Sequence, residues 1–180
     1  MTGKPLYIPV VMLILAVIIV GAIMSFPIFN SNISKEATSN SVKYHGEVCV
    51  WVNDKLIGCN HNLITNTGKD IVYYALTGTT KNVNQIAIAN NTVPQSALDT
   101  SLQGEWTTCG LAKGTVDTTV RNNYGNWTMS KLWTVTCDNV IINATGLYTS
   151  DNELFAETTI PTHTLYANDQ LRISWTIWVS

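Results

Sequence analysis

An apolar run from residue 5 to residue 29 constrains this chain more than any other feature of its sequence. The run contains no charged residue, and it exceeds the roughly 20 residues that a helix needs to cross a hydrocarbon core. Pro9 and Pro27 lie near its ends, where a missing backbone donor matters least. A cleaved secretory signal usually has a shorter apolar region that ends in a small-x-small site. We therefore expect residues 1–29 to be a retained membrane anchor helix.

The basic residues around this run predict its orientation. Lys4 precedes the run, and no further Lys or Arg follows until Lys35. This distribution favours a cytoplasmic N-terminus and an extracellular C-terminal domain. A pilin-type leader is the alternative, in which the helix packs in a filament core; Gly3 and Lys4 stand in the reverse of the order that such a leader needs. Residues 5–29 are thus expected to contact either membrane lipid or packed helices.

The remaining composition indicates one exported domain. Residues 30–43 are polar and aperiodic, which predicts a stalk, or a donor strand that completes a neighbouring subunit's sheet, ahead of a domain at 44–180. Only 12% of the residues are charged and the net charge is −2, so we expect no nucleic-acid partner. Four Asn-x-Ser/Thr acceptors predict glycosylation of the outer side; these are Asn32, Asn90, Asn126 and Asn143.

Four cysteines follow the predicted anchor, and an even count in an exported domain predicts disulfides. Three pairings are formally open. A three-residue hairpin loop at 53–55 would place Cys49 opposite Cys59, and a turn centred on Asn123 would place Cys109 opposite Cys137. Both placements favour cross-strand disulfides. The alternative, a zinc site formed by Cys49, Cys59 and His61, lacks a convincing fourth ligand.

Hydrophobic periodicity predicts a mainly β domain. Residues 132–137 and 171–179 alternate, whereas a helix is expected within residues 62–78, with Thr67 as its cap and Ile71, Tyr74 and Ala75 on one face. Pro161 is expected to interrupt strand pairing. About eight strands and one short helix indicate an antiparallel β-sandwich that is jelly-roll-like.

The tryptophans divide into core and contact candidates. Trp133 and Trp175 share the alternation of buried positions and are expected in the core. Trp127 and Trp178 are assigned to the opposite face and are the interface candidates. A large aromatic residue on the polar side of the last strand needs a cover, for which we favour another subunit over a ligand.

No motif indicates catalysis. The three histidines and twelve acidic residues form no zinc-protease, nucleophile-elbow, phosphate-loop or dinucleotide pattern. Asp99 and Glu105 are close in sequence but are expected in solvated segments. We therefore expect neither an enzyme nor a bound cofactor or metal.

Three stretches carry a family resemblance: residues 59–70 (CNHNLITNTGKD), 144–148 (ATGLY) with 154–158 (LFAET), and 168–177 (NDQLRISWTI). They resemble the β-rich appendage domains of tail-fibre-like and other virion-surface proteins of phages and archaeal viruses, and related archaeal surface proteins. The resemblance implies a fold rather than an activity.

Together these features predict a membrane-anchored, glycosylated structural subunit of a virion surface layer, filament or appendage, which associates with further copies of itself. The alternatives are an adhesin that binds a surface glycan or receptor, and a pilin-like filament subunit.

Overall fold

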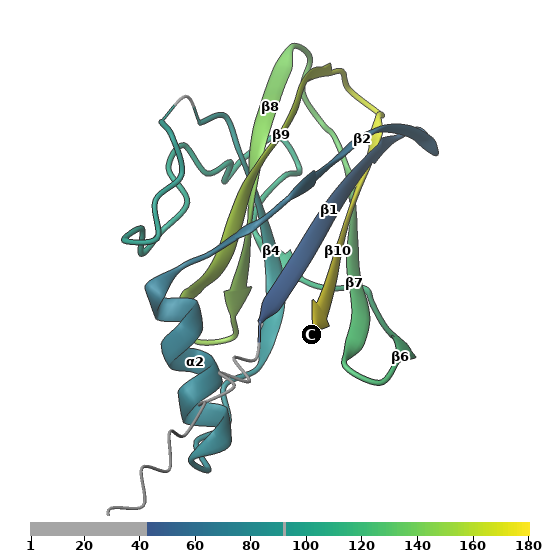
Figure 1. Ribbon diagram of the computed structural model, residues 1–180. Helices are drawn as coiled ribbons and strands as arrows, with labels where there is room; N and C mark the ends of the chain where they lie inside the picture. The colour runs from purple at the N-terminus through teal and green to yellow at the C-terminus, as the bar shows by residue number, and fades with distance from the viewer. Residues whose placement is uncertain (1–42, 92) are drawn as a thin grey trace, which may run out of the picture. The chain divides into compact units, whose positions relative to one another are not determined.

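The computed structural model describes residues 43–91 and 93–180 (Figure 1). The predicted anchor at 1–29, the sequon at Asn32 and the stalk up to residue 42 lie outside the described residues. Within the described part, no helix is both long and apolar enough to cross a membrane.

The described chain forms two antiparallel five-stranded sheets and one helix, α2 (Figure 1). Sheet A has the order β2-β1-β10-β7-β6, and sheet B has the order β3-β9-β8-β4-β5. The elements in chain order are β1 Tyr44–Val52, β2 Lys55–His61, β3 Leu63–Ile64, α2 Asn66–Leu76, β4 Val83–Ala89, β5 Gly114–Thr115, β6 Thr118–Asn123, β7 Asn126–Thr134, β8 Val140–Thr149, β9 Leu154–Leu165 and β10 Gln170–Val179. The expectation of a mainly β domain with one short helix is confirmed.

The main core lies between the two sheets and follows from the alternation of the strands. In β1 and β10 every second side chain is buried, among them Val48, Val50 and Trp175. Trp133 of β7 is also buried, at 4% exposure. The two tryptophans that the periodicity assigned to the core are therefore in the core.

A second, smaller core covers the outer face of sheet B. Residues 96–105 of the connection between β4 and β5 lie over this face, and Leu102 packs there with Ala144, Tyr148 and Leu154. The Leu102 backbone N–H donates to the Tyr148 hydroxyl at 2.7 Å. Because both faces of sheet B are covered here, the first five residues of β9 are all buried.

Helix α2 begins earlier than the sequence predicted. Its N-cap is Thr65 rather than Thr67, and the Thr65 Oγ1 atom accepts from the Gly68 N–H at 2.9 Å. The same hydroxyl donates to the Leu154 carbonyl of β9 at 2.7 Å. Thr65 therefore caps the helix and also ties it to sheet B, a contact that local sequence does not encode. Tyr74, which was expected to share the apolar face with Ile71, is 40% exposed.

The β1–β2 hairpin places its cysteines opposite each other by a route that differs from the expected one. Its loop has two residues, Asn53 and Asp54, both with positive φ, as a type I′ turn requires. An irregularity after Val50 then shifts the register, so that Cys49 is opposite Cys59. The expected three-residue loop is wrong, because the extra residue lies in a bulge and not in the turn.

Pro161 does not end its strand, because β9 continues to Leu165. Pairing with β8 nevertheless shifts between Ile142 and Ala144, whose partners are His163 and Thr159. The proline thus lies in a bulge, where its missing N–H breaks no ladder bond.

Candidate functional site

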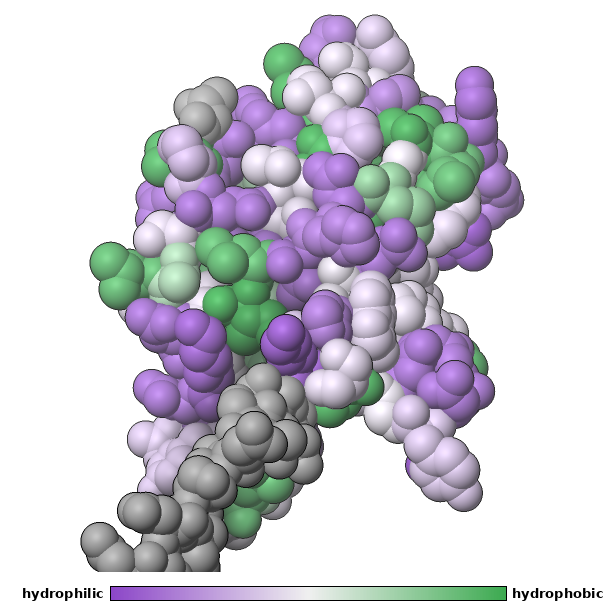
Figure 2. All heavy atoms as spheres, viewed as in Figure 1, coloured by the Kyte–Doolittle hydropathy of each residue, from purple (hydrophilic) through white to green (hydrophobic). Residues whose placement is uncertain are grey.

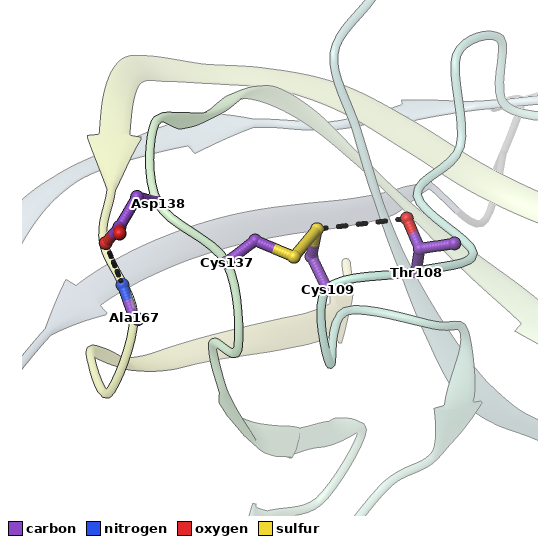
Figure 3. The surroundings of a disulfide bond; sticks show 5 residues. All are labelled: Thr108, Cys109, Cys137, Asp138 and Ala167. Atoms are coloured by element: carbon purple, nitrogen blue, oxygen red, sulfur yellow. Dashed lines mark hydrogen bonds between the residues drawn. A yellow bond between two sulfur atoms is a disulfide. The ribbon is translucent and has the colours of Figure 1, made fainter.

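The second disulfide joins two loops and not two paired strands (Figure 3). Cys109 bonds to Cys137, with their Cα atoms 5.1 Å apart. The cysteines pair as expected, but the cross-strand reason was wrong: β6 starts at Thr118, and the segment around Cys109 is a turn in which Cys109 itself has a φ of 56°. The Thr136 N–H donates to the Cys109 carbonyl at 3.0 Å and holds the two loops together.

Trp178 lies on the outer face of sheet A, as the alternation predicted. It is opposite His45 on one side and opposite Asn126 on the other. The Trp178 and His45 rings are stacked, with centroids 5.5 Å apart and planes 12° from parallel. The His45 Nε2 atom also contacts the Ser180 hydroxyl at 2.9 Å. An aromatic pair therefore stands beside a sequon on the outer face.

Trp127 does not belong to this face. It is the inward partner of Ile177 in the β7–β10 pair and packs against the main core. The expectation that Trp127 lies opposite Trp133 is wrong, because the two positions are six residues apart and strand alternation places them on the same face. The outer face instead carries Trp51, over whose ring the Arg172 guanidinium lies at 4.8 Å.

The described sequons differ in their surroundings. Asn90 is exposed directly after β4. Asn126 begins β7, and its Oδ1 atom accepts from the Asn122 Nδ2 atom at 2.8 Å, which leaves the Asn126 amide nitrogen for a sugar. Asn143 lies within β8, where its Oδ1 atom accepts from the Asn91 N–H at 2.5 Å and the sequon hydroxyl of Thr145 is buried.

An apolar cavity of about 220 Å³ lies between the last turns of α2 and strands β1, β7 and β10. Tyr44, Leu76, Trp127 and Ile177 are among its lining residues. Figure 2 shows hydrophobic residues gathered beside α2 and near the β1–β2 hairpin, with hydrophilic residues over much of the same view. No local sequence pattern marks this cavity, since it arises where elements distant in sequence meet.

An acidic side chain of β9, Glu157, meets an acidic side chain of the segment that covers sheet B, Asp99. The Ser96 N–H donates to Asp99 Oδ2 at 2.9 Å and to Glu157 Oε1 at 3.2 Å. Glu157 is 1% exposed, and burial together with the hydrogen bond to Asp99 raises its pKa to about 7. The expectation that Asp99 is a solvated side chain is therefore wrong, because it is half-buried and accepts the hydrogen bond from the Ser96 N–H. No local signal marks Glu157, because its burial depends on the covering segment.

Glu105 also has partners that the sequence did not indicate. Its carboxylate is 3.3 Å from the Lys113 Nζ atom, and it accepts a hydrogen bond from the Tyr148 hydroxyl. Lys113 in turn lies 4.0 Å from the centroid of the Tyr148 ring. Burial raises the pKa of Tyr148 well above its ordinary value, so this hydroxyl stays protonated and serves as a fixed hydrogen-bonding group.

One group of three potential metal ligands occurs among residues 43–91 and 93–180, namely Glu47, Cys49 and Cys59. Its two cysteines are bonded to each other with an S–S distance of 2.03 Å, so their thiolates cannot bind a metal. His61, the third residue of the zinc alternative, is opposite Glu47 in the β1–β2 register.

The described residues therefore provide aromatic surfaces, an apolar cavity and a buried acidic pair. Comparison of the chain with protein families, curated proteins and solved structures gives no match. Function must accordingly be inferred from the geometry of these features.

Proposed function

We propose that this protein is a membrane-anchored, glycosylated structural subunit of an extracellular assembly. In this proposal residues 1–29 hold the chain in a membrane with its N-terminus cytoplasmic, and residues 44–180 are displayed outside. The two disulfides support an oxidising compartment for the domain. A virion surface layer, filament or appendage is the setting that the sequence resemblance favours, with a jelly-roll-like arrangement of the sheets.

The observation that carries the proposal is the β6 edge of sheet A. The opposite edge strand, β2, is tied to β9, because the Asn60 Nδ2 atom donates to the Thr159 carbonyl at 2.8 Å. Strand β6, Thr118–Asn123, pairs on one side only, with β7, and all six of its residues are exposed. Such an edge presents unpaired backbone N–H and C=O groups to which another chain can add a strand. The edge strands of sheet B, β3 and β5, have only two residues each. We propose that the 30–43 stalk of a neighbouring copy pairs with β6.

The stacked His45 and Trp178 rings give the assembly a second contact. They lie on the outer face of the same sheet, where two flat rings offer apolar area at a low cost in side-chain entropy. A neighbouring copy that covers Trp178 would remove this area from water. The proposal therefore requires copies to meet along sheet A.

The test is electron microscopy of the full-length protein from its source membrane, with the intact mass measured on the same sample. Ordered filaments or arrays support the proposal, and the mass shows whether residues 1–29 are retained or removed as in a pilin. Val120→Lys places a charge on the β6 edge and should abolish the ordered assemblies. Leu98→Lys is the control, because Leu98 is also exposed (77% against 54% for Val120) but lies in the connection that covers sheet B and not on sheet A. Dispersed wild-type monomers, or equal effects of both changes, would contradict the proposal.

An adhesin is the second candidate, and the Trp51–Arg172 pair favours it. Trp51 is half-buried on the outer face of sheet A, the same face that carries Trp178, and such rings can stack on sugars. This candidate predicts a monomer whose binding to a glycan array is lost in Trp51→Ser. Ordered assemblies without glycan binding would exclude it.

A further inference from the structure

One end of the domain, here named the proximal end, is defined by where the described chain begins. Lys43 and Ser180 exchange backbone hydrogen bonds of 2.9 and 3.0 Å there. The Val179 N–H donates to the Gly125 carbonyl at 2.9 Å, which brings the β6–β7 turn to the same place. Tyr44 and Leu76 line one cavity, so the last turn of α2 is at this end as well.

The proximal end exposes large side chains that water solvates poorly. Leu76 is 82% exposed and Tyr73 is 61% exposed on the last turns of α2, and Tyr124 is 91% exposed in the β6–β7 turn. The Arg121 guanidinium lies 4.9 Å from the centroid of the Tyr124 ring. Tyrosine and arginine next to an aliphatic side chain form the combination that suits a membrane–water interface.

The opposite, distal end of the sandwich has a different chemistry. Its turns carry Asn53, Asp138 and Asp169, which hydrogen-bond across the turns: Asn53 Nδ2 donates to Asp169 Oδ1 at 2.8 Å, and Asp138 Oδ1 accepts from the Ala167 N–H at 3.0 Å (Figure 3). Exposed acidic groups of this kind are strongly hydrated. The distal end also exposes Leu56 and Tyr166, at 51% and 52%, so the two ends differ in the acidic turns that accompany these side chains.

The position of the remaining chain favours one occupant for the proximal end. Residues 30–42 are polar and can span at most about 45 Å. They connect Lys43 to the apolar run at 5–29, so the proximal end is the part of the domain with the shortest chain path to that run. A tether of this length raises the effective concentration of the surface at the bilayer.

We propose that the proximal end docks on the lipid headgroup region of the membrane, with Tyr73, Leu76 and Tyr124 entering the interface. This proposal rests on the proposed membrane anchoring by residues 5–29. Acidic side chains also lie at the proximal end: Asp151 is in the β8–β9 turn, next to the Glu153 that pairs with Lys81. Docking is therefore driven by the aromatic and apolar side chains and not by net charge. It would hold the domain at the bilayer with its acidic turns facing outward.

The tryptophans allow a direct test with the full-length protein. All six lie between residues 51 and 178, so none is in the apolar run. Trp127 and Trp178 are at the proximal end. In phosphatidylcholine vesicles, lipids with brominated acyl chains quench tryptophans that approach the bilayer. We expect quenching of the wild type, and loss of most of it in the triple variant Tyr73→Ser, Leu76→Ser and Tyr124→Ser.

The matched control changes the distal end. Leu56 and Tyr166 are 51% and 52% exposed there, and the variant Leu56→Ser with Tyr166→Ser should keep the quenching. Circular dichroism of both variants checks that they are folded. Co-flotation with the vesicles separates the two hypotheses: a protein that does not float contradicts the anchoring itself. A protein that floats without quenching overturns docking and shows that the proximal end faces water. Oligomers that become smaller in the proximal variant overturn docking in favour of contact with a second copy.

Discussion

Glu157 of β9 and Asp99 of the segment that covers sheet B face each other, and the single N–H of Ser96 donates to both carboxyl groups. One N–H cannot compensate two carboxylates, of which Glu157 is buried and Asp99 is half-buried. This contact joins strand β9 of sheet B to the long β4–β5 connection. How firmly the connection is held therefore depends on whether Glu157 is protonated.

The first prediction concerns the pH dependence of stability. Burial raises the pKa of Glu157 from 4.5 to about 7, so the folded state binds this proton more tightly than the unfolded chain does. Its contribution to the free energy of unfolding is complete below about pH 4.5 and is lost as the pH rises to about 7. The change should be of the order of 3 kcal/mol at most. Urea unfolding at several pH values measures it.

The variant Glu157→Gln keeps the size and hydrogen-bonding capacity of the side chain but cannot titrate. We expect it to flatten the dependence between pH 4.5 and 7. Glu47→Gln changes a half-buried carboxylate on the outer face of sheet A and should leave the slope as it is. A slope that persists unchanged in Glu157→Gln would show that another group causes it.

The second prediction compares the two caps that sequence and structure assign to α2. Thr65→Val removes a buried hydroxyl that bonds both Gly68 and Leu154, and it should lower the free energy of unfolding by about 1–3 kcal/mol. Thr67→Val, at the cap position that the sequence favoured, should change it by less than about 0.5 kcal/mol. Thermal unfolding of both variants measures the difference, and equal effects would contradict the structural assignment.

The third prediction concerns Gly68. Alanine in a helix is ordinarily favoured over glycine by about 1 kcal/mol. A Cβ atom at Gly68 would, however, overlap the Phe155 carbonyl oxygen of β9. We therefore expect Gly68→Ala to destabilise the domain by roughly 1–3 kcal/mol, because the helix must move away from the sheet. Lys69→Ala, on the exposed side of the same turn, is the control. A stabilised Gly68→Ala variant would mean that α2 packs less closely on β9.

The fourth prediction ranks the disulfides. The bond between Cys109 and Cys137 closes a separation of 28 residues, and that between Cys49 and Cys59 closes one of 10. Loop-closure entropy assigns them about 3.6 and 2.7 kcal/mol respectively. Replacing Cys109 and Cys137 with alanine should therefore destabilise the domain more than replacing Cys49 and Cys59. Chemical unfolding of the two double variants gives the order, and a reversed order would contradict the entropic account.

The sequence determined those features that depend on neighbours along the chain. Alternation at residues 171–179 predicted which face of β10 is buried, including Trp175, and it placed Trp178 outside. The strand pattern also predicted a mainly β domain, and the even cysteine count predicted disulfides. The pairing that the expected hairpins favoured is the one that the structure has. A side chain on a strand faces inward or outward by a period of two, so a short window of residues contains this information.

Tertiary structure alone decided the features that depend on segments far apart in sequence. Thr65 is the cap because its hydroxyl also reaches β9, and Glu157 is buried because residues 96–105 cover sheet B. The apolar cavity forms only where α2 meets β1, β7 and β10. Such contacts are selected by packing and by the pairing of buried polar groups, which act through space, and no local period records them.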